Sequence, residues 1–295
     1  MIGLIPSLFL AGAMPADAAW PEIPGLTAHA DDSAPVAPSE GAAGRIDSAH
    51  GSRDYLFFAP QRPAARPMLI VMLHGCRQDA AGFARDTAMA ELATARGAHV
   101  VFPQQPQRAN GMRCWNWYHP DHQSAEGGEP ALLAELIEDL AGQTGRPWDD
   151  VFVAGLSAGG AMAAVLGQTM PDRIRAVGIH SGVGTGAAVS AYQGIAAMRE
   201  GAAEFPAPET PMIVFHGDAD RVVALRNAEA LGAHLPGRTH NGPGYTRRVG
   251  PAGEYWQIDG LGHAWSGGRG GGRYVAPGPD ASAEMLRFFW MRRGR

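Results

Sequence analysis

Apolar residues in this chain gather in short continuous runs, and segments with helical spacing separate these runs. A continuous apolar run is typical of a strand that is buried on both faces. The alternation of strands and helices predicts an α/β fold, with a mostly parallel central sheet and helices on both faces. Strands are predicted over 54–58, 68–73, 98–103, from 151 onward, 174–179, 212–215 and 255–258. Helices are predicted over 83–96, 130–140, after 157 and over 280–291.

Two segments before this pattern have a different character. Residues 1–18 are mostly apolar and end in Ala16-Asp17-Ala18, a small-x-small pattern that predicts an export signal cleaved after Ala18. Residues 19–47 are rich in Ala, Pro, Asp, Ser and Gly, which predicts a flexible arm. The α/β domain is therefore expected over 48–295, in a secreted or periplasmic protein.

A candidate nucleophile lies where the apolar run from Val151 changes into a helix of small residues. The junction reads Gly155-Leu156-Ser157-Ala158-Gly159, so Ser157 lies at the apex of a strand–turn–helix unit. Side chains two residues before and after Ser157 would crowd such a turn, which explains both glycines. We therefore predict that Ser157 is a catalytic serine.

A nucleophilic serine needs a base, and the base needs a carboxylate that orients it. Functional groups gather at the carboxyl ends of parallel strands, so we expect these partners after later strands. Asp218 and Asp220 follow the strand over 212–215, and Asp220 is the preferred acid because Asp218 can hold the turn by bonding backbone amides. His263, in a glycine-flanked loop after the last predicted strand, is the predicted base.

An oxyanion intermediate also needs two backbone N–H donors. Ala158, directly after the nucleophile, supplies one, and the loop around Gly75 and Cys76 is expected to supply the other. Cys76 and Cys114 are the two cysteines of the chain. Two cysteines in an exported protein most often pair, and the alternative is two separate buried thiols.

Composition narrows the range of partners. The formal net charge of −5 argues against nucleic acid or an anionic membrane as the main partner. The apolar run near the start is interrupted by Pro6 and Pro15 and is too short to span a bilayer, so no stable membrane insertion is expected. His119 and His122 form one short pair without further ligands, and we expect neither a metal nor an organic cofactor.

Six short motifs of this chain together resemble one family of esterases. In chain order they are Leu73-His74-Gly75-Cys76-x-Gln78, Cys114-Trp115-Asn116-Trp117, Gly155-Leu156-Ser157-Ala158-Gly159-Gly160, His180-Ser181-Gly182, His216-Gly217-x-x-Asp220-x-x-Val223 and His263-Ala264-Trp265-x-Gly267-Gly268. The sequence resembles the catalytic domains of polyhydroxybutyrate depolymerases, with secreted feruloyl and acetylxylan esterases as close relatives. This resemblance implies an α/β-hydrolase fold, a Ser157–His263–Asp220 triad, and oxyanion amides at Cys76 and Ala158.

The resemblance also gives an expected substrate class. Short hydroxyalkanoate polyesters or their oligomers are favoured, and plant-wall feruloyl or acetyl esters are the alternative. Depolymerases that attack solid polymer usually carry a separate binding domain after the catalytic one, and the sequence given ends at Arg295. We therefore expect amorphous polymer, oligomers or small esters as substrates. Two other readings are a serine peptidase on the same fold and a non-catalytic binding module.

Two further features are expected near the site. Trp115, Trp117, Tyr118 and Trp265 are predicted either to line the substrate cleft or to pack against the catalytic loop. The glycine-dense segment Gly267–Gly272 is expected to form a mobile loop beside the site, with a lid as the sharper interpretation.

Overall fold

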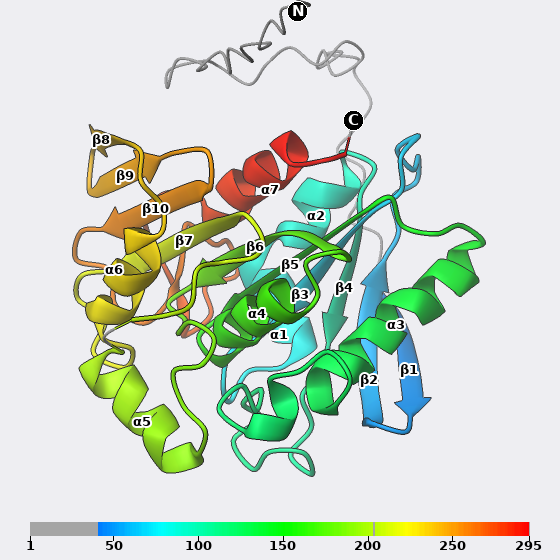
Figure 1. Cartoon of the computed structure of the whole chain (residues 1–295). Helices are drawn as coiled ribbons and strands as arrows, with labels where there is room; N and C mark the ends of the chain where they lie inside the picture. The colour runs from blue at the N-terminus through cyan, green and yellow to red at the C-terminus, as the bar shows by residue number, and fades with distance from the viewer. Residues whose placement is uncertain (1–40, 203, 295) are drawn as a thin grey trace, which may run out of the picture. The chain divides into compact units, whose positions relative to one another are not determined.

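A ten-stranded sheet forms the centre of the computed structural model, which describes residues 41–202 and 204–294 (Figure 1). The expected export signal over 1–18 and the arm up to residue 40 lie outside the described residues. Neighbouring strands follow the order β1-β2-β4-β3-β5-β6-β7-β10-β9-β8, and β11 pairs separately with β12.

The strands are β1 Ala42–Ser48, β2 Gly51–Phe58, β3 Met68–Leu73, β4 His99–Pro103, β5 Asp150–Leu156, β6 Ile174–His180, β7 Met212–Gly217, β8 Arg238–Gly242, β9 Tyr245–Val249, β10 Gly253–Ile258, β11 Trp265–Ser266 and β12 Val275–Ala276. The helices are α1 Ala80–Thr87, α2 Met89–Thr94, α3 Gly128–Thr144, α4 Ala158–Thr169, α5 Ala191–Glu200, α6 Leu225–Ala233 and α7 Ala281–Met291, with a short 3-10 helix η1 at Pro120–His122.

The predicted mostly parallel sheet is confirmed. Strands β4, β3, β5, β6, β7 and β10 run parallel to one another. At one edge β2 pairs antiparallel with β4 and with β1, and at the other edge β9 pairs antiparallel with β10 and with β8. Figure 1 shows β1 and β2 in blue at one edge and β8–β10 at the other. Because the central strands are parallel, their carboxyl ends meet at a single edge of the sheet, where the loops that carry function in such folds gather.

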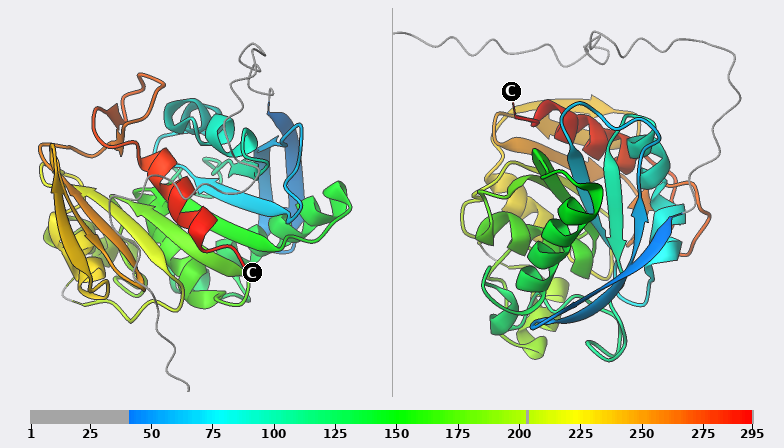
Figure 2. Two further views of the ribbon diagram at one scale, coloured as in Figure 1. Left: turned by 90° about the horizontal axis from the view of Figure 1, so that it is seen from above. Right: turned by 90° about the vertical axis from the view of Figure 1, so that its right-hand side faces the viewer.

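Helices cover both faces of this sheet. Side chains alternate along each strand, so each face of the sheet presents its own set of apolar side chains to the helices. In β3, Leu69 and Val71 pack into the cluster that includes α3 and α4, whereas Met68 and Ile70 pack into the cluster that includes α1, α2 and α7. The left view of Figure 2 shows α3 and α4 in green on one side of the sheet and α1 and α2 in cyan on the other. None of the helices in the described ranges is long and apolar enough to cross a bilayer.

The single helix predicted over 83–96 is wrong, because the chain breaks at Ala88 into α1 and α2. Ala88 adopts a left-handed backbone conformation with φ of 51°. The buried hydroxyl of Ser282 in α7 donates a 2.6 Å hydrogen bond to the carbonyl oxygen of Thr87. A contact from the other end of the chain thus satisfies the backbone at the break, and no local turn residue marks it.

The predicted arm over 19–47 extends too far, because Ala42–Ser48 forms β1 and pairs with β2 as an antiparallel hairpin. The prediction also missed α5, α6, β8 and β9. These elements are mixed in polarity, and several of their residues are half-buried or exposed. Apolar periodicity is weak in such segments, so packing on the rest of the domain decides their structure.

Helix α7 begins as predicted, with Asp280 as its N-cap and its carboxylate accepting a bond from the N–H of Ala283. Ser282, in the first turn of α7, joins the helix to two other parts of the fold. Its Oγ accepts a 3.0 Å bond from Nε1 of Trp265 and donates to Thr87. Ser282 therefore holds α7, the α1–α2 break and β11 together.

Replacing Ser282 with Ala should lower the free energy of unfolding by about 1–3 kcal/mol, since two buried polar groups lose their partner. Urea denaturation followed by circular dichroism measures this. The Ser48→Ala variant is the control, because water can replace its hydroxyl and its effect should stay within about 0.5 kcal/mol. Equal stability of the two variants would contradict the assigned role.

Candidate active site

Ser157 lies in a sharp turn between β5 and α4. Its backbone has φ of 58° and ψ of −120°, a conformation that a residue with a side chain adopts only under strain. The N–H of Ser157 donates a 2.9 Å bond to the carbonyl oxygen of His180 at the end of β6. The turn is thus tied to the neighbouring strand, and Ser157 is 7% exposed.

The two glycines of this turn are required by close backbone approach, as the sequence predicted. A Cβ at Gly155 would lie 2.4 Å from the carbonyl carbon of Gly159. A Cβ at Gly159 would lie 2.0 Å from the carbonyl oxygen of Leu73 in β3. Any side chain at either position would therefore push α4 away from β3 and β5.

Asp220 and His263 meet at the ends of β7 and β10. Nδ1 of His263 donates a 2.7 Å hydrogen bond to Oδ2 of Asp220. Oδ1 of Asp220 accepts bonds of 2.8 and 2.9 Å from the N–H groups of Val222 and Val223. Burial would raise the pKa of Asp220, but the bond and charge of His263 and the backbone bond from Val223 outweigh it, so the pKa lies below its ordinary value.

The other acidic candidate, Asp218, has a different partner. Its Oδ1 accepts a 2.7 Å bond from the N–H of Gly260, in the loop that leads to His263. We had expected Asp218 to bond the backbone amides of its own turn, but it instead braces the loop of His263 from the end of β7. The structure brings Asp220, and not Asp218, to the imidazole.

Within residues 41–202 and 204–294, no hydrogen bond joins the hydroxyl of Ser157 to His263. Catalytic hydrogen bonds of this kind are often long without substrate and tighten in the complex. His180 connects the turn of Ser157 to the segment of His263. The carbonyl oxygen of His180 accepts a bond from the N–H of Ser157, and the imidazole of His180 accepts a 3.1 Å bond from the N–H of Ser266, three residues after His263.

The loop after β3 passes directly beside Ser157. A Cβ placed on Gly75 would lie 3.4 Å from the Cβ of Ser157. The N–H of Gly75 donates to Oε1 of Gln78 at 2.7 Å, and the N–H of Arg77 donates to the carbonyl of Met112 at 2.7 Å. In the described part of the chain, no acceptor is bonded to the N–H of Cys76. The bonds made by the N–H groups of Gly75 and Arg77 thus fix the loop on both sides of Cys76 and leave the N–H of Cys76 available as a donor.

The expected disulfide is present between Cys76 and Cys114, whose Cα atoms are 4.2 Å apart. It joins the loop after β3 to the segment that holds Trp115 and Asn116. The two cysteines are 38 residues apart, and closing a loop of this length is worth roughly 3–4 kcal/mol in the chain-entropy model.

A buried carboxylate that the sequence analysis missed holds the same segment from the inside. Glu129, in the first turn of α3, is 1% exposed. Its oxygens accept bonds from the backbone N–H of Asn116 at 2.7 Å, from Nδ2 of Asn116 at 2.8 Å, from Nη2 of Arg53 at 3.0 Å and from Nε2 of Gln105. Asn116 in the Cys-Trp-Asn-Trp motif was the available signal, because an amide that lies between two tryptophans and is half-buried needs a hydrogen-bond partner.

The aromatic residues near the site mostly pack in the core. Trp115 is 0% exposed, Trp265 is 1% exposed and Trp117 is 4% exposed. A substrate-lining role for these three is therefore not seen, and the packing alternative holds. Tyr118 is the one member of the set that stays partly exposed. The sequence pattern could not separate the two readings, since both require aromatic side chains in the same loop.

The glycine-dense segment Gly267–Gly272 packs against α1 and is not a free lid. A Cβ at Gly270 or Gly272 would lie 2.3 Å from an oxygen of the Asp86 carboxylate. The N–H of Arg269 donates to the carbonyl of Asp86, and its guanidinium pairs with Glu91 at 2.9 Å. The glycines are needed for close approach to α1.

Three buried histidines surround the site without belonging to its predicted triad. Burial lowers the pKa of His74 to about 4 and that of His180 to about 3. Burial is also the main cause that lowers the pKa of His216, whose Nε2 bonds the carbonyl of Val223 at 2.9 Å. In the described ranges, no group of three or more His, Cys, Asp or Glu residues could hold a metal ion.

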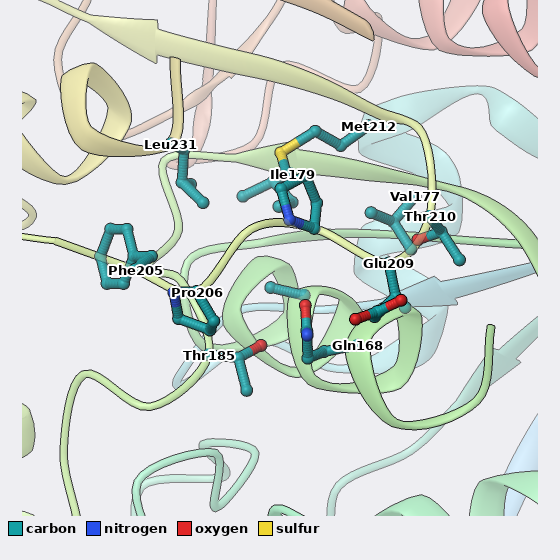
Figure 3. Close-up of a pocket in the computed structure, with 13 residues that line it drawn as sticks. Gln168, Val177, Ile179, Thr185, Phe205, Pro206, Glu209, Thr210, Met212 and Leu231 are labelled. Carbon is teal, nitrogen blue, oxygen red and sulfur yellow. The ribbon is translucent and has the colours of Figure 1, made fainter. Parts of the chain in front are cut away.

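A narrow pocket elsewhere in the fold contains none of the predicted site residues. Figure 3 shows it between the second half of α4, β6 and the segment that leads into β7. Its labelled lining includes Gln168, Ile179, Phe205 and Thr210. It lies apart from Ser157, and we assign it no role in the site.

Removing the disulfide with the double variant Cys76→Ser/Cys114→Ser should lower the free energy of unfolding by about 3–4 kcal/mol, because the unfolded chain regains the freedom of a 38-residue loop. Chemical denaturation with and without a reducing agent measures it. The wild-type protein should lose the same amount on reduction. Unchanged stability in both experiments would contradict the prediction.

The free energy of unfolding should fall as the pH drops below about 6.5. The folded-state pKa of His74 is about 4, whereas an unfolded histidine titrates near 6.5, so unfolding takes up a proton between these values. One such group contributes a slope of up to about 1.4 kcal/mol per pH unit. Urea unfolding at several pH values should show a shallower slope for His74→Gln than for the wild type. Parallel curves would refute this reading.

Comparisons with known proteins agree with this geometry. The family model described as Esterase PHB depolymerase matches residues 53–250, about two thirds of the 295 residues. Poly(3-hydroxyalkanoate) depolymerase C of Paucimonas lemoignei is 28% identical over 56% of this chain and 43% of its own length. Acetylxylan esterase A of Talaromyces purpureogenus is 26% identical over 61% of this chain and 52% of its own length. The chain thus spans about half the length of these curated relatives.

Among solved structures, an acetyl xylan esterase from Aspergillus awamori has a TM-score of 0.68 at 18% identity, covering 84% of this chain and 100% of its own. A puromycin-hydrolysing peptidase of Mycobacterium tuberculosis has a TM-score of 0.57 at 17% identity, covering 86% of this chain and 39% of its own. These likenesses show the shared α/β-hydrolase fold, which also hosts peptidases. From the family match, the chain belongs to the esterase family of polyhydroxybutyrate depolymerases.

Proposed function

We propose that this chain is a secreted serine esterase in which Ser157, His263 and Asp220 form a catalytic triad. The observation that carries the proposal is the 2.7 Å bond from His263 to the buried carboxylate of Asp220, at the sheet edge that also presents Ser157. A carboxylate kept ionised in this way orients the imidazole and stabilises the positive charge that it gains during the reaction.

The proposed reaction begins when the hydroxyl of Ser157 attacks the ester carbonyl. Because Nδ1 of His263 carries the proton shared with Asp220, its Nε2 is free to take the proton of Ser157 and then pass it to the leaving alcohol. The N–H groups of Ala158 and Cys76 are the proposed donors to the oxyanion. Ala158 is the first residue of α4, where helical N–H groups have no partner in the helix. Water then hydrolyses the acyl-enzyme.

The favoured substrate class is a short hydroxyalkanoate polyester or its oligomers. The family match and the likeness to the depolymerase of Paucimonas lemoignei support it. A plant-wall ester is the second candidate, which the likeness to acetylxylan esterases in both sequence and fold favours. The disulfide between Cys76 and Cys114 supports an oxidising location outside the cytosol.

The test is hydrolysis of p-nitrophenyl butyrate and its matched amide, amorphous polyhydroxybutyrate, methyl ferulate and acetylated xylan by the purified chain. The Ser157→Ala variant should fold normally and lose more than about a thousandfold in kcat, since the triad supplies most of the rate. The Ser48→Ala variant, which changes a serine on β1, should keep wild-type rates.

The outcomes separate the substrate classes. Release of hydroxybutyrate products supports the depolymerase reading, and activity confined to ferulate or acetyl esters would move the chain to plant-wall substrates with the same mechanism. Cleavage of amides as fast as matched esters would favour a peptidase. Wild-type turnover by Ser157→Ala would overturn the triad.

A further inference from the structure

His180 is a fully buried histidine at the end of β6, and the proposed reaction does not use its side chain. It is 0% exposed, and its ring stacks on Trp265 with centroids 5.1 Å apart and on Phe215 with centroids 5.8 Å apart. These contacts come from the segment after His263 and from β7. The imidazole of His180 therefore lies between the segments that carry Asp220 and His263, two of the three proposed triad residues.

The hydrogen bonds of the ring define its tautomer. Nε2 lies 3.1 Å from the backbone nitrogen of Ser266, which can only donate, so Nε2 must be the unprotonated nitrogen. Nδ1 then carries the hydrogen and donates to Oγ of Ser181 at 3.1 Å. Burial first, and then the charges of His216 and His263, lower the pKa of His180 against the opposing effect of Asp220, so the ring stays neutral at physiological pH.

The backbone of His180 serves the opposite side of the site. Its carbonyl oxygen accepts the 2.9 Å bond from the N–H of Ser157. Gly160 and Gly182 allow α4 to approach this turn, because a Cβ at Gly160 would lie 3.1 Å from the same carbonyl oxygen and a Cβ at Gly182 would lie 3.0 Å from the N–H nitrogen of Ala161. The His-Ser-Gly motif thus receives a structural explanation that its sequence alone did not give.

We propose that His180 is a positioning residue that sets the loop of His263 at a fixed place relative to Ser157. Its main chain holds the serine turn, and its ring holds Ser266 in β11, three residues past His263. The inference rests on the proposed function, because it assigns His180 to the reaction of Ser157 and His263. His180 itself touches no substrate.

The proposal makes the acceptor at Nε2 the critical atom. Gln is long enough to place a side-chain oxygen near the position of Nε2, whereas Asn reaches only the position of Nδ1. His180→Gln should therefore keep the bond to Ser266, and His180→Asn should keep the polarity of the site but lose that bond. His180→Leu removes both hydrogen bonds of the ring.

The experiment measures kcat and KM for p-nitrophenyl butyrate, corrected for the folded fraction by circular dichroism. A displacement of about 1 Å in a catalytic group costs on the order of a hundredfold in rate, so kcat of His180→Leu and His180→Asn should fall by about that factor with little change in KM. His180→Gln should recover most of the loss.

A matched control is His99→Leu, because His99 is also buried, stacks on Phe57 and contacts Trp148 in an edge-to-face arrangement, but lies at the opposite end of the parallel strands. It should lower the melting temperature and leave kcat of the folded protein unchanged. If His180→Leu does not fold, the pair His180→Gln and His180→Asn still decides the question.

The outcomes distinguish this inference from the function on which it rests. Equal kcat in His180→Gln and His180→Asn, or wild-type kcat in folded His180→Leu, would overturn the positioning role while Ser157→Ala stays inactive. Turnover retained in Ser157→Ala would remove the proposed function and this role together. A low kcat in His180→Asn together with a near wild-type kcat in His180→Gln supports the positioning role of His180.

Discussion

Close backbone packing around the turn of Ser157 is the constraint on which the rest of the site depends. The turn is strained, with φ of 58°, and exists because α4 lies against β3 and β5 more closely than any side chain at Gly155 or Gly159 would allow. The carbonyl of His180 fixes the same turn from β6. This packing aims the amino end of α4 at the sheet edge, where backbone donors and the helix dipole favour a developing negative charge.

The two sides of the site are held by different interactions. On one side, Gln78, the disulfide and the buried carboxylate of Glu129 fix the loop after β3 and leave the N–H of Cys76 without a partner in the described chain. On the other side, Asp218 and the ring of His180 brace the segments before and after His263. Because all of these anchors except the exposed Asp218 are buried or covalent, they hold the proposed donors and the proposed base in place without substrate, as electrostatic preorganisation requires.

The sequence predicted what depends on local pattern and missed what depends on distant contacts. Strand β3 and the turn of Ser157 follow from a continuous apolar run and from glycine spacing, and both were found. The helix break at Ala88 depends on a hydrogen bond from Ser282, almost two hundred residues later in the chain. In the sequence, Glu129 has the pattern of an ordinary first-turn helical glutamate, and its role follows only from its contacts with Arg53 and Asn116. Trp115 and Trp265 carried an ambiguous aromatic signal that only their burial resolved.

The most direct test of the central claim is to locate the covalent adduct that a serine-directed phosphonate forms with the purified chain. Peptide mass spectrometry after labelling should find one modified residue, Ser157, because this is the hydroxyl that the proposed base and the proposed backbone donors activate. The His263→Ala variant, which lacks the proposed base, should be labelled much less. An enzyme that hydrolyses esters but carries its adduct on another residue, or carries none, would contradict the account.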